Sequence, residues 1–443
     1  GGGRGRWQGK RSRGADGPKV PYSDLVLENE NFEKYYKAQQ IMPESEWEAF
    51  MECIRTPLPT TFRISTTGPF AREIREELRH SLGSLLQSLQ QGSAEVVPRC
   101  LSWYPNELAW HVSLSRKALR KDPIYSVFQK FLVSQNTTGN ITRQEAVSMI
   151  PPLLLRVEPH HKVLDMCAAP GSKTSQLIEF MHKDTVEPSG MIFANDADNP
   201  RCHMLVHQLK RLASPNVAVI NVYGQQIPNM KMLRSEAAQG GPTEPLVFDR
   251  VLCDVPCSGD GTFRKAPDMW RKWGTNHANG LHKLQGMLLQ RGLEMLAVGG
   301  RLVYSTCSLN PIENEAVVGS VLARWGDAVT LEDVSADLPG LERRPGMTSW
   351  RVGDQQGTMY TKHDELEGHK DAYRMPPSLF PVPDSTVPLT RCVRVYPHQQ
   401  DTGGFFIGAI TKNAHLTPRA EAKEADAKAE ATQVKAEGEA QGG

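Results

Sequence analysis

The sequence lacks the long apolar runs, the metal-ligand spacings and the phosphate-binding loops that define several common protein classes. None of its apolar runs approaches the roughly 20 residues of a membrane-spanning helix. Its eight cysteines form no zinc-finger pattern, and we expect no metal site. Neither the P-loop nor the dinucleotide-binding glycine pattern is present, and we find no internal repeat. We also find no secretory-type apolar leader, which favours reduced thiols and an intracellular setting.

Positive and negative charges nearly balance overall, but they are unevenly distributed along the chain. The net charge is +1, yet residues 1–20 hold six Lys/Arg and one Asp, whereas residues 415–443 hold four Lys/Arg and six Asp/Glu. We predict a disordered basic arm at 1–20 and a low-complexity tail at 413–443. The arm can serve RNA contact or nuclear import, or be a solvated tail. In the folded part, a nucleic-acid surface needs local clustering of charge.

Between the tails, the pattern predicts two α/β domains. Residues 21–138 mix helical patterns with a few short apolar runs, which indicates a smaller accessory domain. Residues 139–412 alternate strands with amphipathic helices, which predicts a doubly wound, Rossmann-like parallel sheet closed by a hairpin. The five main strand candidates are 162–167, 191–196, 217–221, 248–254 and 301–307. The four main helix candidates are 172–181, 201–212, 281–298 and 312–325.

The first strand–helix turn, "VLDMCAAPGSKTSQ", has the position of a ligand site in such sheets. Gly171 lets the backbone approach a ligand, and Ser172 is a candidate N-cap. Asp196 ends the next strand, where it can accept hydrogen bonds from ribose hydroxyls. An acid there without a pyrophosphate cradle suits an adenosine ligand that lacks phosphates, such as S-adenosylmethionine. The alternative is an ordinary tight turn with a helix-capping aspartate.

Two cysteines follow the fourth and fifth strands, in "CDVPCSGDGT" and "YSTCSLNP". Cys257 and Cys307 then face the same edge of the sheet. A cysteine beside a methyl donor suggests methylation of carbon 5 of cytosine, because thiolate addition at carbon 6 makes carbon 5 nucleophilic. Asp254 can bind the polar edge of the pyrimidine. The alternative for each cysteine is a small buried apolar residue.

Four motifs, "DMCAAPGSKT", "ANDADNPRC", "CDVPCSGDGT" and "YSTCSLNPIENEAVV", closely resemble the Nop/Sun (RsmB-like) family of RNA cytosine-5 methyltransferases. The likeness covers about residues 20–412 and is strongest to the eukaryotic tRNA-type branch. It implies an S-adenosylmethionine-dependent enzyme that acts on RNA, most readily tRNA. It also implies a nuclear protein, nucleolar as an alternative, with some in the cytoplasm. The sequence does not fix the oligomeric state.

The resemblance also assigns the site residues. Cys307 is implied as the nucleophile, Cys257 as the residue that assists product release, and Asp254 as the residue at the cofactor–cytosine junction. Asp196 is implied to bind the ribose, and Lys173 to reach the target base as well as the cofactor. The implied cofactor loop consists of Cys167, Ala168, Ala169, Pro170, Gly171, Ser172 and Lys173. One departure is Tyr223, which stands where the family usually has an acid near the adenine.

Other features have two interpretations each. In "FRKAPDMWRKW" (263–273), we favour cations and stacking tryptophans that contact RNA over a helix with buried tryptophans. Arg63 either meets RNA or forms a surface salt bridge. Gly403 and Gly404 match a family motif or form a plain hairpin turn. We expect His398 to be structural.

Two other functions remain open. A catalytically silent RNA-binding scaffold is disfavoured by the intact cysteine pair and Asp254. A DNA cytosine-5 methyltransferase would use the "PC" cysteine, Cys257, as its nucleophile. An amino-group methyltransferase would need a Pro-Pro-aromatic sequence after the fourth strand, and "DVPCSG" lacks it.

Overall fold

The computed structural model describes residues 26–82, 98–121, 125–233, 243–369, 372–382 and 385–416. The predicted basic arm at 1–20 lies outside these residues, as does the predicted tail apart from 413–416. No helix among the described residues is long and apolar enough to cross a bilayer.

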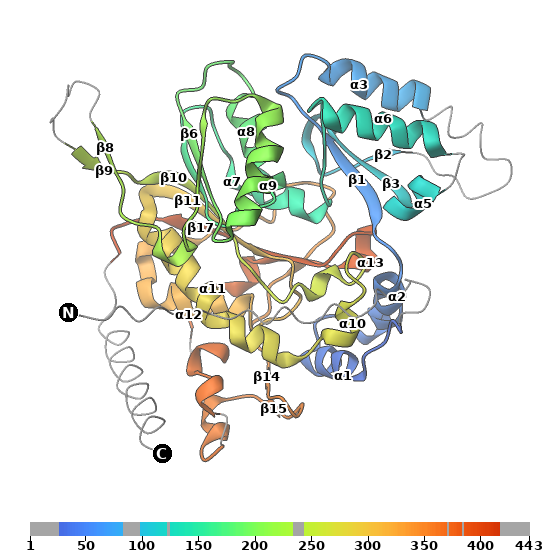
Figure 1. Ribbon diagram of the computed structural model, residues 1–443. Helices are drawn as coiled ribbons and strands as arrows, with labels where there is room; N and C mark the ends of the chain where they lie inside the picture. The colour runs from blue at the N-terminus through green and yellow to red at the C-terminus, as the bar shows by residue number, and fades with distance from the viewer. Residues whose placement is uncertain are drawn as a thin grey trace, which may run out of the picture.

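A nine-stranded mixed sheet forms the centre of the molecule (Figure 1), with the main order β13-β16-β17-β11-β10-β5-β6-β7 and with β12 paired to β17. The five predicted strands are β5 (Lys162–Asp165), β6 (Met191–Asn195), β7 (Val217–Ile220), β10 (Phe248–Asp254) and β11 (Leu296–Thr306). These five strands pair in parallel. The predicted closing hairpin is confirmed, because β16 (Val393–Val395) and β17 (Phe405–Lys412) pair antiparallel with each other, and β17 pairs antiparallel with β11.

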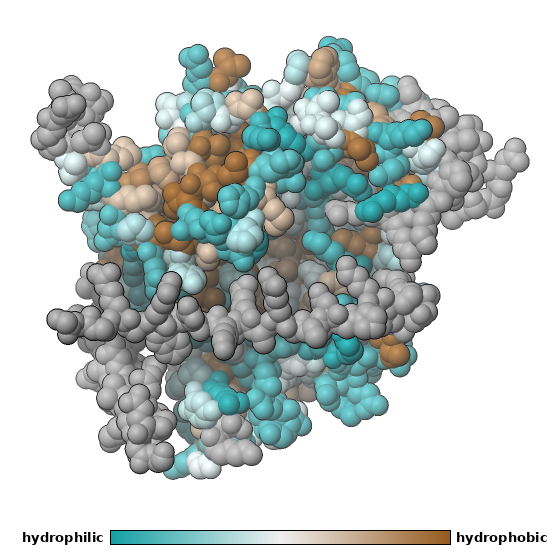
Figure 2. Space-filling model, in the orientation of Figure 1, coloured by the Kyte–Doolittle hydropathy of each residue, from teal (hydrophilic) through white to brown (hydrophobic). Residues whose placement is uncertain are grey.

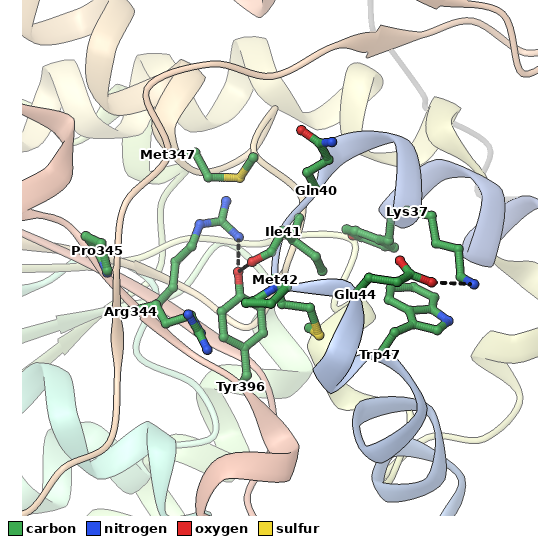
Figure 3. A pocket seen from close by; sticks show the side chains of 13 residues that line it. Lys37, Gln40, Ile41, Met42, Glu44, Trp47, Arg344, Pro345, Met347 and Tyr396 are labelled. Atoms are coloured by element: carbon green, nitrogen blue, oxygen red, sulfur yellow. Dashed lines mark hydrogen bonds and ion pairs between the residues drawn. The ribbon is translucent and has the colours of Figure 1, made fainter.

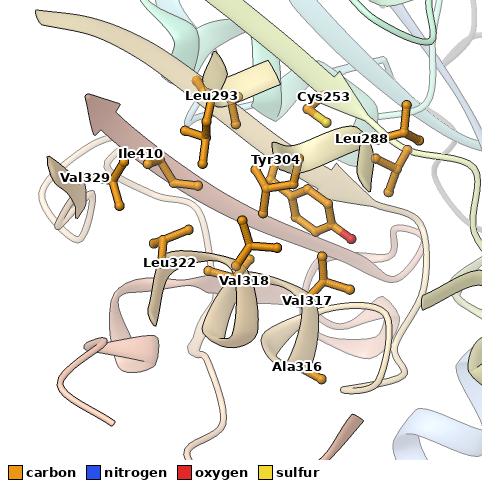
Figure 4. Close-up of a cluster of buried hydrophobic side chains, with 14 of the residues drawn as sticks. Cys253, Leu288, Leu293, Tyr304, Ala316, Val317, Val318, Leu322, Val329 and Ile410 are labelled. Atoms are coloured by element: carbon orange, nitrogen blue, oxygen red, sulfur yellow. The ribbon is translucent and has the colours of Figure 1, made fainter. Parts of the chain in front are cut away.

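Helices cover both faces of this sheet, as the doubly wound fold requires. Alternate strand residues enter opposite cores: Val163 packs in the cluster that contains helix residues Leu177 and Leu205, and Leu164 in the cluster that contains Leu288 and Leu322. The first cluster involves α7 (Ile150–Leu155), α8 (Ser172–Met181) and α9 (Asn199–Leu209). The second involves α11 (Thr275–Met295) and α12 (Glu315–Trp325), and Figure 4 shows part of it around Tyr304. The predicted α/β fold class is therefore confirmed.

A second, four-stranded antiparallel sheet belongs to the accessory region. Its order is β2-β3-β1-β4. The strands are β1 (Pro59–Ile64), β2 (Arg99–Cys100), β3 (Ala109–Ser115) and β4 (Ile141–Arg143). The helices of this region are α3 (Ala71–Glu77), α5 (Arg116–Lys121) and α6 (Ser126–Thr137). Because β4 pairs with β1, this sheet extends past residue 138, where we placed the domain boundary.

The first two helices pack away from the accessory sheet. The aromatic side chains of α1 (Glu30–Gln39) and α2 (Glu44–Arg55) join Phe263, Trp270 and Trp273 in one buried cluster. This N-terminal part of the predicted accessory domain thus forms a core with residues of the predicted domain 139–412.

Several short elements complete the fold. They are β8 (Lys231–Leu233), β9 (Thr243–Pro245), β12 (Val329–Leu331), β13 (Arg344–Pro345), β14 (Val352–Gly353), β15 (Met359–Tyr360), α10 (Met269–Lys272) and α13 (Pro397–Gln400). On the face shown in Figure 2, hydrophilic side chains cover the region of α1, whereas apolar side chains gather near β6 and β10. The strand beyond β6, β7, ends the sheet, and its four residues are only half-buried. Apolar side chains therefore reach the surface at this end of the sheet.

Arg63 contradicts both sequence interpretations. Its side chain is fully buried in β1 and forms an ion pair with Glu179 of α8, while its Nε donates to Gln144 Oε1 at 2.7 Å. Burial raises the pKa of the Glu179 carboxyl despite the neighbouring guanidinium. The arginine thus joins the accessory region to α8 inside the protein. It is neither an RNA contact nor a surface salt bridge.

Candidate active site

The carboxyl ends of β5, β10 and β11 converge on one cavity. The chain runs outward from β5 to β6 and β7 and then returns to β10 on the other side of β5, so this edge is the switch point of the sheet. The cavity measures about 710 Å³. Its lining includes eight predicted site residues, which are Cys167, Ala168, Ala169, Pro170, Ser172, Lys173, Asp254 and Cys307. Gly171, Asp196 and Cys257 lie around it but do not belong to the lining.

The accessory region supplies one wall of this cavity. Pro57, Leu58, Pro59 and Thr61 line it from β1 and the segment before it, and Ser115 lines it from the end of β3. The cavity is therefore closed by both sheets, although the predicted site residues all come from one of them.

The structure brings the two predicted cysteines together. The Sγ atoms of Cys257 and Cys307 are 3.3 Å apart, and either thiol can donate a hydrogen bond to the other. The hydrogen bond with Cys307 and burial raise the pKa of the Cys257 thiol well above its ordinary value. All eight cysteines of the chain are free thiols. Cys253 differs from this pair, because its side chain is fully buried in the core beneath β10 (Figure 4).

Lys173 and Asp254 form an ion pair in the cavity. Lys173 Nζ lies 2.8 Å from Asp254 Oδ2, and the Ser305 hydroxyl donates to Asp254 Oδ1 at 2.7 Å. Burial acts to lower the pKa of Lys173, but the Asp254 carboxylate outweighs it and the pKa is raised. The ammonium group also lies 5.4 Å from the ring centroid of Phe405. A protonated amine thus lies beside a carboxylate in the cavity that Cys307 also lines.

The predicted cofactor loop is held by Asp196 from behind. Asp196 is buried at the end of β6; its Oδ2 accepts from the Ala169 N–H at 3.2 Å and its Oδ1 from the Asp198 N–H at 3.0 Å. The N-cap of α8 is Gly171, with φ of 107°, so the prediction of Ser172 as the N-cap is wrong. A side chain at Gly171 would combine this backbone conformation with a 2.9 Å approach to Leu205, which only glycine avoids.

Sequence reasoning missed Asp165. This residue ends β5, lines the cavity and is fully buried. Thr174 Oγ1 donates to Asp165 Oδ2 at 2.8 Å, whereas Oδ1 has no hydrogen-bond partner among the described residues. Burial raises the pKa of Asp165 to about 7. The available signal was an acid at the end of the first strand, directly before the glycine turn.

Asp165→Asn is expected to gain stability relative to the wild-type protein as the pH rises. The folded-state pKa of about 7 exceeds the ordinary value of 3.8, so the folded state binds the proton more tightly. Wild-type stability therefore falls between those two pH values, by about 1.4 kcal/mol per unit of pKa shift. Asparagine keeps an oxygen for Thr174 and has no proton to lose. Melting curves at pH 4.5 and pH 8 should show a larger gain for the variant at pH 8, and equal gains would exclude this titration.

The segment 263–273 does not present stacking aromatics. Trp270 and Trp273 are buried against α1, so the favoured RNA-stacking interpretation is wrong for them. Arg264 is also buried, where it donates to Thr402 O at 2.8 Å and pairs with Asp401 at 2.6 Å. Three cations of the segment remain exposed, which are Lys265, Arg271 and Lys272. Lys265 lines the cavity mouth.

The glycine pair after β16 packs against the Cys257 loop. Gly404 N–H donates to Gly261 O at 2.8 Å, and Gly261 N–H donates to Cys307 O at 2.9 Å. A Cβ at Gly404 would lie 3.0 Å from Gly261 Cα and 2.7 Å from Leu309 Cδ2. These glycines therefore permit close packing of loops, which a plain hairpin turn would not require. His398 lies outside the cavity, with Nε2 at 2.9 Å from Glu46 Oε2, in a structural position.

A second cavity, of about 530 Å³, lies apart from the cysteines (Figure 3). Polar side chains in its lining have partners: Lys37 pairs with Glu44 at 3.2 Å, and the Tyr396 hydroxyl donates to the backbone carbonyl of Ile41 at 2.7 Å. Its lining contains no predicted site residue. Tyr223 is 62% exposed after β7 and lines neither cavity. Among the described residues, no group of three His, Cys, Asp or Glu side chains is placed to bind a metal.

Comparison with known proteins agrees with this geometry. The sequence model of the family described as 16S rRNA methyltransferase RsmB/F matches residues 152–411. A multisite-specific tRNA:(cytosine-C(5))-methyltransferase of Saccharomyces cerevisiae is 49% identical over 91% of this chain and 58% of its own length. A multisite-specific tRNA:(cytosine-C(5))-methyltransferase, trm4b, of Schizosaccharomyces pombe is 46% identical over 93% of this chain and 64% of its own length.

A crystal structure of a methyltransferase homolog protein from Pyrococcus horikoshii superposes with a TM-score of 0.55 at 26% identity, covering 85% of this chain and 93% of that chain. The present chain spans about three fifths of the two curated fungal relatives, 58% and 64% of their lengths. The family match covers the central sheet and the loops that carry both cysteines. The chain therefore belongs to the RsmB/F methyltransferase family.

Proposed function

We propose that this chain is an S-adenosylmethionine-dependent RNA cytosine-5 methyltransferase that acts on tRNA. The observation that carries the proposal is the pair of thiols 3.3 Å apart at the edge of a cavity lined by the cofactor loop. The names of the two fungal relatives support tRNA as the substrate class.

The cavity fits S-adenosylmethionine in size and chemistry. Its volume of about 710 Å³ is in the range of cofactor sites. Asp165 Oδ1, which is buried and has no hydrogen-bond partner among the described residues, offers a polar contact inside it. Asp254, which pairs with Lys173, adds a carboxylate. The loop from Cys167 to Lys173, with Asp165, Asp196 and Asp254, would hold the cofactor. When bound, S-adenosylmethionine supplies an electrophilic methyl group on a positively charged sulfur.

Cys307 is the nucleophile in this proposal. It lines the cavity, whereas Cys257 does not, which supports Cys307 as the thiol that meets the base. Its Sγ forms a bond to carbon 6 of cytosine, and the ring electrons move to carbon 5, which becomes nucleophilic. After methylation, the carbon 5 proton passes to solvent, its bonding electrons restore the double bond between carbons 5 and 6, and the carbon 6–sulfur bond breaks to release Cys307 as the thiolate.

Three other side chains serve this cycle. Cys257 lies beside Cys307 Sγ as a protonated thiol and assists the departure of Cys307 from the product. Asp254, held by Lys173 and Ser305, faces the polar edge of the pyrimidine and stabilises charge that develops there. Lys173, the other partner of this ion pair, is protonated and also reaches the target base.

Methyl transfer to tRNA tests the proposal directly. The purified protein should transfer tritiated methyl groups from S-adenosylmethionine to unmodified tRNA, and digestion should yield 5-methylcytidine. A matched cytosine-containing DNA duplex should remain unlabelled. Cofactor binding without any RNA product would favour the scaffold alternative, and labelling of the DNA alone would favour the DNA-type enzyme.

Asp196→Ala should weaken binding of S-adenosylmethionine about tenfold or more. The substitution removes acceptors for the ribose hydroxyls, each worth about 0.5–1.5 kcal/mol and more when charged. It also removes the acceptors of the Ala169 and Asp198 N–H groups. Titration calorimetry measures the change, with Asp198→Ala, which removes the side-chain cap of α9, as the control. An unchanged affinity would remove Asp196 from the cofactor site.

We further propose a nuclear location, nucleolar as an alternative, with some protein in the cytoplasm. The Gly- and Arg-rich residues 1–20 support it, and they lie outside the described residues. Imaging of tagged protein with and without residues 1–20 tests it. An unchanged distribution would show that these residues carry no targeting signal.

A further inference from the structure

One buried carboxyl group joins the two loops that carry the cysteines. Glu313 lies between β11 and α12 and is fully buried. Its Oε1 accepts hydrogen bonds from the Ser258 N–H at 2.7 Å and from Gln285 Nε2 at 2.9 Å. Its Oε2 accepts from the hydroxyls of Ser258 at 2.5 Å and Ser308 at 2.6 Å. Since Ser258 follows Cys257 and Ser308 follows Cys307, this one side chain binds the neighbour of each reactive thiol.

We propose that Glu313 is a positioning residue that sets the distance between the Cys257 and Cys307 thiols. The inference rests on the proposed function, and it names a residue with no part in bond making. A carboxylate is suited to this task, because it only accepts and offers about four lone-pair directions. The four donors around Glu313 occupy them. Gln285 also donates to Pro256 O at 3.0 Å, which fixes the Cys257 loop from α11 as well.

Positioning matters here because both cysteines lie in loops just after strands. The backbone of these loops does not by itself fix the positions of the thiols. The strand ladder pairs β10 with β11 only as far as Asp254 and Ser305. Beyond that point, the Gly261–Cys307 backbone bond and the Asp260 carboxylate, which accepts from Leu309 N–H at 2.7 Å, join the loops further on. Glu313 binds the residue directly after each of the two cysteines. A displacement of about 1 Å at reacting groups can cost on the order of 100-fold in rate.

Two substitutions separate positioning from charge. Glu313→Ala removes all four contacts. Glu313→Gln can keep them, with the amide oxygen in the place of Oε1 and the amide NH₂ donating to the two serine hydroxyls. Ser308 Oγ can then donate to Asp260 Oδ1, which lies 3.0 Å away. If position is what Glu313 provides, glutamine restores what alanine loses.

The decisive measurement needs neither RNA nor methyl transfer. In a glutathione buffer, the Cys257 and Cys307 thiols lose two protons and two electrons to form a disulfide, and one glutathione disulfide becomes two glutathione thiols. Mass spectrometry of the alkylated peptides gives the fraction closed. We expect the effective concentration of the thiol pair to fall about tenfold or more in Glu313→Ala and to stay within about threefold of wild type in Glu313→Gln.

A matched control is Leu322→Ala, which opens a cavity under α12 (Figure 4) without touching either cysteine loop. It should lower the melting temperature and leave thiol pairing unchanged. In tRNA methylation, Glu313→Ala should lower kcat about 100-fold with little change in KM for RNA, and Glu313→Gln should recover most of the loss.

Wild-type thiol pairing in Glu313→Ala, or equally poor pairing in the alanine and glutamine variants, would overturn the positioning role. A parallel loss of pairing in Leu322→Ala would also overturn it, because general destabilisation would then explain the effect. If pairing changes as expected while the wild-type protein methylates no RNA, the positioning role stands and the proposed function fails.

Discussion

Cys307→Ala is expected to reduce methyl transfer to the background level, a loss on the order of 10⁴-fold or more, as when the nucleophile of another covalent enzyme is removed. Without the thiol that lines the cavity, carbon 6 of cytosine receives no nucleophile and carbon 5 stays unreactive. The same variant should form no covalent protein–RNA species. Transfer of tritiated methyl groups and denaturing electrophoresis measure the two losses separately.

A matched control is Cys53→Ser, a half-buried residue of α2 outside the cavity lining, which should retain activity. Binding of S-adenosylmethionine by Cys307→Ala should stay close to wild type, because this variant leaves the cofactor loop intact. A covalent species formed by Cys307→Ala would show that the two cysteines have been assigned in the wrong order.

Cys257→Ala is expected to accumulate a covalent protein–RNA adduct that the wild-type protein resolves. Cys307 remains, so the carbon 6 bond can still form, but the thiol 3.3 Å from its Sγ is gone. Expulsion of Cys307 then becomes slow, and a shifted band should survive denaturing electrophoresis in this variant. The double variant, which also lacks Cys307, should lose the band.

The same gel distinguishes the two cytosine chemistries. In a DNA-type mechanism, Cys257 would be the essential nucleophile, and the band would accumulate in Cys307→Ala instead. Rapid turnover by Cys257→Ala without any adduct would show that Cys307 leaves unaided, and the releasing role would then be abandoned.

Much of the central fold could be predicted because local pattern and topology agree. Parallel strands buried on both faces are near-continuous apolar runs, and their carboxyl ends meet at one edge. This rule predicted that Cys257, Cys307 and Asp254 lie at one edge. In the structure the two thiols are 3.3 Å apart, and Asp254 binds Lys173 and Ser305.

The errors concern contacts between residues far apart in the chain. The tryptophans at 270 and 273 have the spacing of an exposed basic-aromatic helix, and their partners on α1 are more than 200 residues away. Arg63 has the appearance of a surface cation, because Glu179 lies 116 residues later. The role of Glu313 could not be predicted for a similar reason, because its partner Ser258 lies 55 residues earlier. The periodicity of apolar residues shows which face of a helix or strand is apolar. It does not show which distant segment covers that face.

The aromatic cluster between α1, α2 and the segment 263–273 has a consequence for biosynthesis. Phe32 and Tyr36 leave the ribosome early, yet Phe263, Trp270 and Trp273, which cover them, are made more than 200 residues later. At about 5–20 residues per second, the nascent chain keeps these rings uncovered for roughly 10–50 seconds. Tyr396 completes the cluster later still. The rings of α1 and α2 therefore stay without this cover until the chain has passed residue 273, and slow codons between residues 60 and 260 would lengthen that exposure.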